Sequence, residues 1–591
     1  MRESIFSIPY IKLLKSNKKD INLELSIPAK IALLKNITIE PLIPFLQYQC
    51  YSKNINPEFF LNDHDNIIHD AIDKNSKLYK FKPDIIYLIL SLENFSERLF
   101  NSHSLESDEI ENEISKVIEF ITLIIKSVRQ NSQATIILKN FEENPYLSSG
   151  ISEILNKNSN LNITKKINEL ILNMVNKYKN VYLLDINLSI SKIGYENFID
   201  NRNYFTSKNP YSELALRHIS FEASKYIASI KGLTKKCIVL DCDNTLWAGI
   251  VGEDGLSGIQ CGRNPPGSYY YLFQQKLLNL KKNGFLLAIN SKNNFQDVID
   301  VFDKHPEILL KKNDFASIKI NWEDKVKNLA DISNELNISL DHIVFIDDSE
   351  FEVEMVHKLL PQVETILMPK NLSMIPNVLH NRDFFDRIDY IGSDINRTDF
   401  FIAEKQRLEE KQKIRNISEY LNELKLCTRI SSAKENEITR IAQLTQKTNQ
   451  FNLTTKRYNE VTIENYINDK RIEVISIEAE DKFGDYGLIG VGIIKNVSDY
   501  KIIDTFLMSC RALGRGIEII LLKECIKASL NMDSKALYGI YMPTNKNLQV
   551  KDFYSKNGFE VISSNKDQTE FKWTQNNLHE LEQNHILEKK K

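Results

Sequence analysis

The chain has 591 residues, with 76 lysines and arginines against 79 aspartates and glutamates, so its net charge is −3. This balance argues against a dedicated nucleic-acid binder and gives no attraction toward acidic membranes. The seven cysteines contain no CxxC pair, which indicates reduced thiols in a cytoplasmic protein. No apolar run reaches the roughly 18 residues of a membrane span, so no membrane association is expected. A chain of this length exceeds one hydrophobic core, and several domains are expected.

The first part of the chain alternates apolar runs with longer amphipathic segments. Four runs begin at Ile31, Asp84, Ala134 and Asn180 and read IALLKNITI, DIIYLIL, ATIILKNF and NVYLLDIN. Strands separated by helices are typical of an α/β domain with a parallel sheet. We assign this domain to residues 1–230.

A second series of the same kind begins with CIVLDCD at Cys237. It continues with FLLAINS and HIVFIDD, and the segments between them have helical periodicity, as in DKVKNLADISNELNI. These features predict a second α/β domain over residues 231–395.

The remainder of the chain has three sections. The charged segment FFIAEKQRLEEKQKIRN predicts a solvated linker helix over residues 396–416. Residues 417–575 mix helices with β-rich runs such as YGLIGVGIIKN, which is typical of an α+β domain. The polar tail at residues 576–591 is expected to fray.

Polar side chains follow the strands of the second domain at the points where they end. Asp241 and Asp243 come after CIVL, Ser291 ends FLLAINS, and Asp347 and Asp348 follow HIVFI. Because ligands bind at the carboxyl ends of parallel strands, we expect these side chains in one crevice. Converging carboxylates repel each other unless a cation is present, and Mg²⁺ takes oxygen ligands together with a substrate phosphate.

A phosphoryl-transfer role follows for each of these side chains. Asp241 is predicted to be the nucleophile that accepts the phosphoryl group, and Asp243 the general acid and then the base. Ser291 and Lys325, which lies in INWEDKVKN, are predicted to hold phosphate oxygens. Taken singly, these residues would equally suit a strand cap, a turn or a solvated helix, so the prediction depends on their order along the chain.

The motifs DCDNTLW, INSKNN, NWEDK and FIDDSEFEVE, in this order, resemble the haloacid dehalogenase (HAD) superfamily, and more narrowly its FkbH-like branch. The resemblance implies a HAD-like Rossmannoid parallel sheet with Asp241 as phosphoaspartate nucleophile. It also implies Mg²⁺ ligands from the Asp241 side chain, the Asp243 backbone carbonyl and the fourth-motif pair Asp347 and Asp348, with Asp348 as the direct ligand. The segment GIVGEDGL lies where the family has a flap.

FkbH-like proteins are associated with loading glyceryl units from 1,3-bisphosphoglycerate onto the phosphopantetheine thiol of an acyl carrier protein. The resemblance therefore implies such a carrier as a partner and a phosphorylated small molecule as substrate. Loading members have a cysteine directly before SKN, whereas this chain has Asn290. If an enzyme thioester forms, Cys510 is the next candidate thiol and Cys261 the one after it; the alternative for Cys510 is a buried strand cysteine.

The stretch SCRALGRGIE contains an RxxGxG pattern made by Arg511, Gly514, Arg515 and Gly516. It resembles the Gcn5-related N-acetyltransferase (GNAT) signature, in which loop N–H groups bind the pyrophosphate of coenzyme A. In NLQVKDFYSKNGFEV, Tyr554 stands where that family often has an acid for the leaving thiol. An ordinary turn would fit the pattern alone, and the pocket could accept a carrier-bound phosphopantetheine arm instead.

The first domain loosely resembles the SGNH-hydrolase-like region of longer family members, with a flavodoxin-like sheet. Lys35 and Asn36 stand where the hydrolase serine motif would fall, and His218 has no acid three residues before it. Asn140 could be the family asparagine or only a strand-end cap. We interpret this domain as a degenerate, non-hydrolytic module.

Three functional hypotheses remain open. The first is Mg²⁺-dependent phosphoryl chemistry coupled to acyl transfer onto a carrier thiol, and the second is a phosphatase and acyltransferase of nucleotide-sugar or surface-glycan biosynthesis. The third, a scaffold that retained only the folds, is disfavoured by the intact acids of the second domain.

Overall fold

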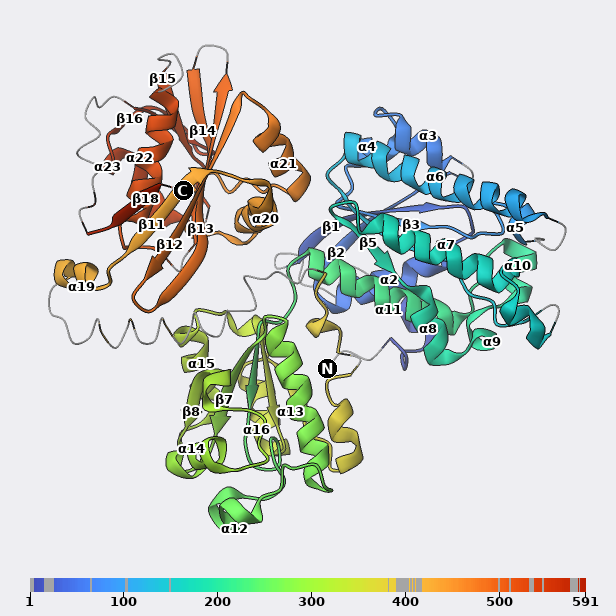
Figure 1. The fold of residues 1–591 in the computed structure, drawn as a ribbon, viewed down its shortest axis with the longest axis horizontal. Helices are drawn as coiled ribbons and strands as arrows, with labels where there is room; N and C mark the ends of the chain where they lie inside the picture. The colour runs from blue at the N-terminus through green and yellow to red at the C-terminus, as the bar shows by residue number, and fades with distance from the viewer. Residues whose placement is uncertain are drawn as a thin grey trace. The chain divides into compact units, whose positions relative to one another are not determined.

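The computed structural model of the protein contains three separate β-sheets (Figure 1). It describes residues 5–14, 26–63, 66–100, 105–147, 150–380, 382–388, 403, 407, 410, 417–497, 500–509, 512–530, 536–544, 547–573, 583 and 585–590. Within these residues, every helix is too short or too polar to cross a bilayer.

The first sheet is five-stranded and parallel, with the strand order β2-β1-β3-β4-β5. Its strands are β1 (Ile27–Lys35), β2 (Ile55–Leu61), β3 (Ile85–Ile89), β4 (Thr135–Lys139) and β5 (Val181–Leu184). Every residue of β3, IIYLI, is buried, as expected for a parallel strand covered on both faces.

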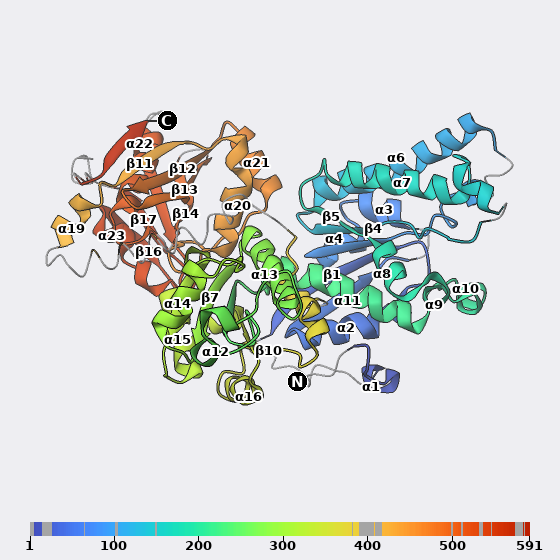
Figure 2. The ribbon, with the colours of Figure 1, turned by 60° about the horizontal axis from the view of Figure 1, so that its bottom comes forward.

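Helices cover both faces of this first sheet, as Figure 2 shows. Helices α2 (Ile43–Ser52), α8 (Ile186–Ile193) and α11 (Glu213–Ile230) pack on one face; α3 (Ile67–Ile72), α6 (Ser107–Asn131) and α7 (Asn160–Val175) pack on the other. The shorter helices are α1 (Tyr10–Leu14), α4 (Lys77–Phe81), α5 (Glu97–Phe100), α9 (Tyr195–Phe198) and α10 (Asn201–Ser207).

A short segment far along the chain joins this first domain. Asp383 forms an ion pair with Lys53 at 2.6 Å, and Asp386 forms one with Lys225 at 3.3 Å. Residues 380–389 therefore group with the N-terminal domain, although the sequence places them in the second domain.

The second sheet is also parallel, with the order β10-β9-β6-β7-β8. Its strands are β6 (Cys237–Leu240), β7 (Leu286–Ser291), β8 (Phe315–Ile320), β9 (Ile343–Asp347) and β10 (Glu364–Leu367). Its helices are α12 (Val251–Gly258), α13 (Gly267–Lys282), α14 (Phe295–Lys304), α15 (Lys325–Glu335) and α16 (Glu350–Leu359). The central strand β6 lies between β9 and β7, so the ends of these three strands are neighbours at one edge.

The third sheet has eight strands in the order β16-β17-β15-β14-β13-β12-β11-β18. They are β11 (Cys427–Ser432), β12 (Ile472–Asp481), β13 (Gly484–Val497), β14 (Tyr500–Met508), β15 (Ala536–Tyr541), β16 (Phe559–Ser564), β17 (Thr569–Trp573) and β18 (Leu587–Lys590). Helix α22 (Ile517–Leu530) packs on one face, and α20 (Ile438–Lys447) and α21 (Glu460–Asn468) pack on the other (Figure 1). Helices α19 (Ile417–Glu423) and α23 (Phe553–Lys556) complete the domain.

Strands β14 and β15 pair in parallel only from Tyr500 to Ile503, although β14 continues to Met508. The two strands therefore stop pairing before the loop that carries the RxxGxG pattern. This mixed α+β arrangement is the one expected from the sequence.

Two expectations for the ends of this domain differ from the structure. The tail was expected to fray, but Leu587–Lys590 form β18, which pairs with β11 and so covers an open sheet edge. Most of the linker lies outside the described residues, but Arg407 within it is not solvated. It is 1% exposed, because its guanidinium forms two hydrogen bonds with Asp481, at 2.7 and 2.8 Å.

Candidate active site

The carboxyl edge of the second sheet brings together the acids predicted from the sequence. Asp241 follows β6, and Asp347 and Asp348 lie at the end of the neighbouring strand β9. One carboxylate oxygen from each of the three lies within 4.8 Å of the others. Among the described residues, no other group of acids, histidines or cysteines is compact enough to hold a metal ion.

Lys325 lies between two of these acids. Its ammonium donates to Asp241 at 2.7 Å and to Asp347, and all three side chains are at most 8% exposed. Burial raises the pKa of Asp241 to about 6, while the charge of Lys325 acts in the opposite direction. The pKa of Lys325 is raised, because the attraction of the two carboxylates outweighs the effect of burial.

The side chain of Asp348 is more exposed than that of Asp347, although neighbouring groups still partly cover its carboxyl group. Burial of its carboxyl group and the nearby charge of Asp241 both raise its pKa. A cation at this edge would relieve the repulsion between these carboxylates, which is the electrostatic reason to expect one.

The Asp243 side chain lies outside the metal-type cluster. Its Oδ1 accepts from the indole of Trp247 at 2.9 Å and from the backbone N–H of Val251 at 3.0 Å. Its Oδ2 accepts from the Asn293 amide at 2.7 Å. The side chain is thereby fixed in the turn after β6, two residues beyond Asp241.

Ser291 ends β7 and is buried beside this turn. The Asn293 amide that contacts Asp243 also lies 3.5 Å from the Ser291 hydroxyl. Asn293 is not among the residues predicted from the sequence, although its place in the NSKNN motif, two residues after Ser291, could have pointed to it.

Asn290 is fully buried one residue before Ser291. Its side-chain N–H donates to the backbone carbonyl of Lys325 at 2.9 Å, and its oxygen accepts from Asn328 at 3.0 Å. Asn290, which stands where loading members have a cysteine, is therefore hydrogen-bonded to the backbone of Lys325.

Cys261, the candidate thiol within the described residues, is enclosed. The Cys261 sulfur lies 3.4 Å from Nδ1 of His305, and both residues are buried. Burial, with the nearby charge of Glu307, raises the pKa of Cys261 to about 12. The thiolate that an acyl-enzyme needs is therefore strongly disfavoured at this position.

The RxxGxG loop precedes α22 in the third domain. Arg511 and Cys510 lie outside the described residues. Gly514 and Gly516 have φ values of 73° and 84°, a region that favours glycine, and Arg515 lies 5.2 Å from the centre of the Tyr486 ring.

A carboxylate of the chain itself lies beside this loop. The backbone N–H groups of Glu518, Gly514 and Gly516 lie near the Glu518 side chain and favour its charged form, and its Oε2 is buried without a partner among the described residues. Burial raises the pKa of Glu518, although these N–H groups and Arg515 act in the opposite direction. Glu518, the second residue of α22, is not among the residues predicted from the sequence.

Tyr554 does not face an open pocket. It is 1% exposed, its ring packs on Gly539 and Phe559, and its hydroxyl has no hydrogen-bond partner among the described residues. Burial raises its pKa far above the usual range. Its position is that of a core residue, so a role as acid for a leaving thiol would require the pocket to open.

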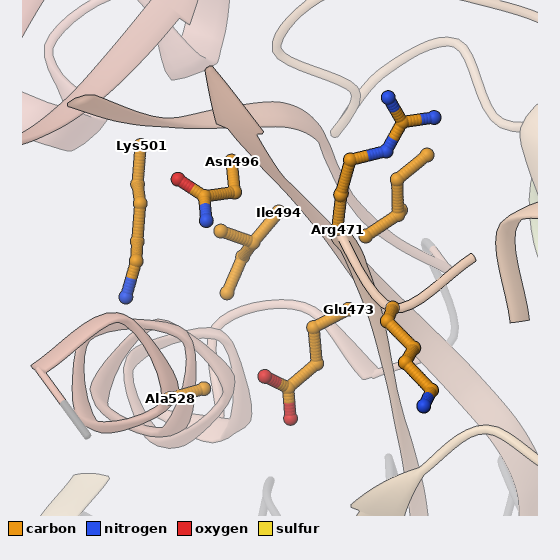
Figure 3. Close-up of a pocket in the computed structure, with 8 residues that line it drawn as sticks. Arg471, Glu473, Ile494, Asn496, Lys501 and Ala528 are labelled. Carbon is orange, nitrogen blue, oxygen red and sulfur yellow. The ribbon is translucent and has the colours of Figure 1, made fainter. Parts of the chain in front are cut away.

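A hollow elsewhere in the third domain is too small for a cofactor. Figure 3 shows Arg471, Glu473, Asn496 and Lys501 around it, and its volume of about 10 Å³ is that of a single water site.

Two of the polar residues singled out in the first domain, Asn36 and Asn140, bind backbone groups. The Asn36 side chain accepts from the Ser91 N–H at 2.7 Å and donates to the Ser91 carbonyl at 3.0 Å. Asn140 accepts from the Ile186 N–H at 2.8 Å, as a strand-end cap does. The centres of the His218 and Phe6 rings lie 4.6 Å apart with the rings tilted by 46°, and Nδ1 of His218 is buried without a partner among the described residues.

Lys35 is also buried and pairs with Glu40 at 2.9 Å. The first domain contains a cavity of about 230 Å³. It is lined by Tyr10, Pro41, Phe45, Asn203, Ser207, Asn209, Tyr211, Glu213 and Leu216.

Comparison with known proteins gives one family match. Residues 30–229 match the family model described as FkbH, N-terminal domain. The comparison with curated proteins found no match.

Solved structures resemble two parts of the chain. The N-terminal part of the protein BF1531 from Bacteroides fragilis, described as containing a phosphatase domain complexed with Mg, is 26% identical. The alignment covers 66% of this chain and 100% of that one, with a TM-score of 0.57.

Two acetyltransferases each align with 25% of this chain. The ribosomal-protein-S18-alanine N-acetyltransferase of Escherichia coli is 13% identical over 92% of its own length, with a TM-score of 0.21. The PaiA N-acetyltransferase of Thermoplasma acidophilum, in complex with coenzyme A, is 16% identical over 99% of its length, with a TM-score of 0.19. Residues 30–229 thus match the FkbH N-terminal domain, and the chain is similar over 66% of its length to a phosphatase-containing protein.

Proposed function

We propose that the second domain is a Mg²⁺-dependent phosphohydrolase of the HAD type that acts through a phosphoaspartate. The observation that carries this proposal is the cluster of Asp241, Asp347 and Asp348, with ligand oxygens within 4.8 Å of one another and Lys325 bonded to two of them. The likeness to a phosphatase-containing protein complexed with Mg supports it.

The residues present suit Mg²⁺, because all three offer carboxylate oxygens and no softer ligand is among them. Asp241 and Asp348 would hold the ion together with the Asp243 carbonyl, and Asp347 would hold Lys325 beside them. When bound, the ion would neutralise the charge of the phosphoryl oxygens.

The side chains of the chain supply the remaining chemistry. An oxygen of Asp241 attacks phosphorus, the bond to the leaving oxygen breaks, and Asp243 gives that oxygen a proton. Asp243 then takes a proton from water, which attacks the phosphoaspartate and releases phosphate. The Lys325 ammonium and the Ser291 hydroxyl hold phosphoryl oxygens, and Lys325 also keeps Asp241 ionised.

We further propose that the substrate is an acyl phosphate such as 1,3-bisphosphoglycerate and that the acyl group passes to the phosphopantetheine thiol of a carrier protein. The basis is the match of residues 30–229 to the FkbH N-terminal domain, together with the FkbH-like motifs of the second domain. Because Asn290 replaces the thiol and Cys261 is enclosed, the acceptor thiol attacks the acyl carbonyl directly. In this step a C–S bond forms, the C–O bond to the acyl phosphate breaks, and phosphate leaves with the thiol proton. The phosphoaspartate step then acts on the ester phosphate of the glyceryl group.

The alternative is a phosphatase of nucleotide-sugar or surface-glycan biosynthesis with an acyltransferase domain. Under both proposals, the first domain would be a non-hydrolytic module of SGNH-like fold, because Asn36 and Asn140 bind backbone groups.

Phosphate release from acetyl phosphate, 1,3-bisphosphoglycerate and glucose 1-phosphate would test these proposals. We expect Mg²⁺-dependent release that is fastest from the acyl phosphates, and a loss of about 100-fold or more in excess EDTA, because the carboxylate cluster would then repel the substrate. Faster release from glucose 1-phosphate would favour the glycan alternative. Equal rates with and without EDTA would contradict the metal assignment.

Coenzyme A or a carrier-bound phosphopantetheine arm is the proposed ligand of the third domain, and Glu518 decides how well it binds. The Glu518 carboxylate and a phosphate group would compete for the N–H groups of Gly514 and Gly516. We therefore expect Glu518→Gln to bind coenzyme A about tenfold more tightly, because one negative charge leaves an anion site.

Isothermal titration calorimetry of the full chain with coenzyme A measures this difference. Glu524→Gln on the same helix, whose side chain pairs with Lys527, is the matched control and should bind as the parent does. Weaker or unchanged binding by Glu518→Gln would show that the loop does not receive the phosphate groups.

A further inference from the structure

Three buried or half-buried asparagines surround the start of helix α15. Asn290, at the end of β7, is 0% exposed, and Asn328, one turn into the helix, is 1% exposed. Asn321, just after β8, exchanges two side-chain hydrogen bonds with Asn328, at 2.9 and 3.2 Å. Its backbone N–H also donates to the Ser291 carbonyl at 3.1 Å.

Asn290 joins this group to Lys325. Its oxygen accepts from Asn328 at 3.0 Å, and its N–H group donates to the Lys325 backbone carbonyl at 2.9 Å. Lys325 is the first residue of α15, and a carbonyl oxygen has a second lone pair besides the one used in its helix. Asn290 therefore attaches the first turn of α15 to the strand that ends in Ser291.

The other end of Lys325 lies in the active site. Its ammonium contacts Asp241 and Asp347, so a shift of the first turn of α15 would move the charge away from the nucleophile. A lysine side chain has four rotatable bonds, and its placement here depends on where its backbone is held.

We propose that Asn290 is a positioning residue that acts through Lys325 and places the ammonium group between Asp241 and Asp347. The proposal rests on the phosphohydrolase function above. It also gives the amide at position 290 a task that a cysteine cannot perform, because a thiol is a weak donor and a weak acceptor. Position 290 can therefore hold either the amide that makes these two hydrogen bonds or an acyl-carrying thiol, but not both.

Acetylation of lysines by acetic anhydride, followed by peptide mass spectrometry, tests the placement without relying on turnover. Lys325 is 4% exposed and should be protected in the parent chain. Asn290→Leu fills the space but removes both hydrogen bonds, and we expect its Lys325 to be acetylated at least about fivefold more. Asn290→Ala should behave in the same way.

Gln274→Leu is the matched control. Gln274 is a fully buried amide of the same domain, with hydrogen bonds to Leu246, Leu309 and Leu310. The Gln274→Leu substitution should lower the thermal midpoint of the domain without exposing Lys325. Equal acetylation of Lys325 in the parent and both Asn290 variants would overturn the proposal, and so would equal exposure in Gln274→Leu.

A double-mutant cycle with Lys325→Met then tests the link to catalysis, with Mg²⁺ and acetyl phosphate as the probe. Asn290→Leu alone should lower kcat by about 10- to 100-fold, the usual loss for a residue behind a catalytic group. In the Lys325→Met background, it should change the rate less than about twofold. The same loss in both backgrounds would mean a purely structural role. Full activity of Asp241→Asn, by contrast, would overturn the phosphohydrolase function and leave the acetylation result standing.

Discussion

Asp241→Asn is expected to lower phosphate release by at least about four orders of magnitude, which is the scale of loss when a covalent nucleophile is removed. The amide is close in shape to the carboxylate, but it cannot form the acyl phosphate. The substitution also removes one of the three carboxylates whose oxygens lie within 4.8 Å of one another, so the affinity for Mg²⁺ should fall as well.

The measurement is phosphate release from acetyl phosphate at saturating Mg²⁺, so that a weaker metal site does not limit the rate. Asp303→Asn, at an exposed position of α14, is the control and should retain parental activity. Turnover of Asp241→Asn within tenfold of the parent would remove Asp241 from the mechanism.

Lys325→Met is expected to have the second-largest effect, on both activity and stability. Methionine replaces most of the side-chain volume but leaves Asp241 and Asp347 buried without their cation. Breaking a buried ion pair in this way costs about 3–5 kcal/mol. Activity should fall by at least about 100-fold, because the charge that holds phosphoryl oxygens is lost.

The stability loss should depend on pH in a definite direction. The pKa of Asp241 in the folded chain is already raised from 3.8 to about 6, so its contribution to stability is fully present below pH 3.8 and is lost as the pH rises through 6. Without Lys325, which acts against this shift, the pKa of Asp241 rises further. The variant should therefore lose more stability, relative to the parent, at pH 8 than at pH 5.

Urea unfolding in EDTA, followed by tryptophan fluorescence, measures this loss, since Trp247 and Trp322 both lie in the second domain. Lys327→Met is the matched control, because Lys327 is on the same helix and its side chain is 60% exposed in its ion pair with Glu323. A pH-independent loss, or an equal loss in Lys327→Met, would contradict the buried pairing of Lys325.

The sequence predicted the parts of the structure that depend on local pattern. Asp241, Asp347 and Asp348 directly follow apolar runs, and the ends of parallel strands meet at one edge, so their convergence could be inferred. The parallel sheets followed in the same way from strands that alternate with helices.

Features that depend on distant or unusual pairings could not be inferred. Asn290 finds its partners 35 and 38 residues along the chain, and nothing in its local sequence indicates them. Strand β18 has the sequence LEKK, which has no alternating apolar pattern, and forms because β11 offers it an unpaired edge. Glu518 resembles an ordinary acidic residue in the first turn of a helix, and only the shape of the preceding loop brings its carboxylate onto Gly514 and Gly516.

Borohydride trapping tests the central claim most directly. The chain would be incubated with Mg²⁺ and acetyl phosphate, quenched in sodium borohydride, digested and sequenced by mass spectrometry, because borohydride reduces a phosphoaspartate to homoserine. The phosphoaspartate mechanism predicts homoserine at position 241, at no other aspartate, and only when acetyl phosphate is present. Phosphate release without homoserine at position 241, or homoserine at Asp347 or Asp348 instead, would contradict it.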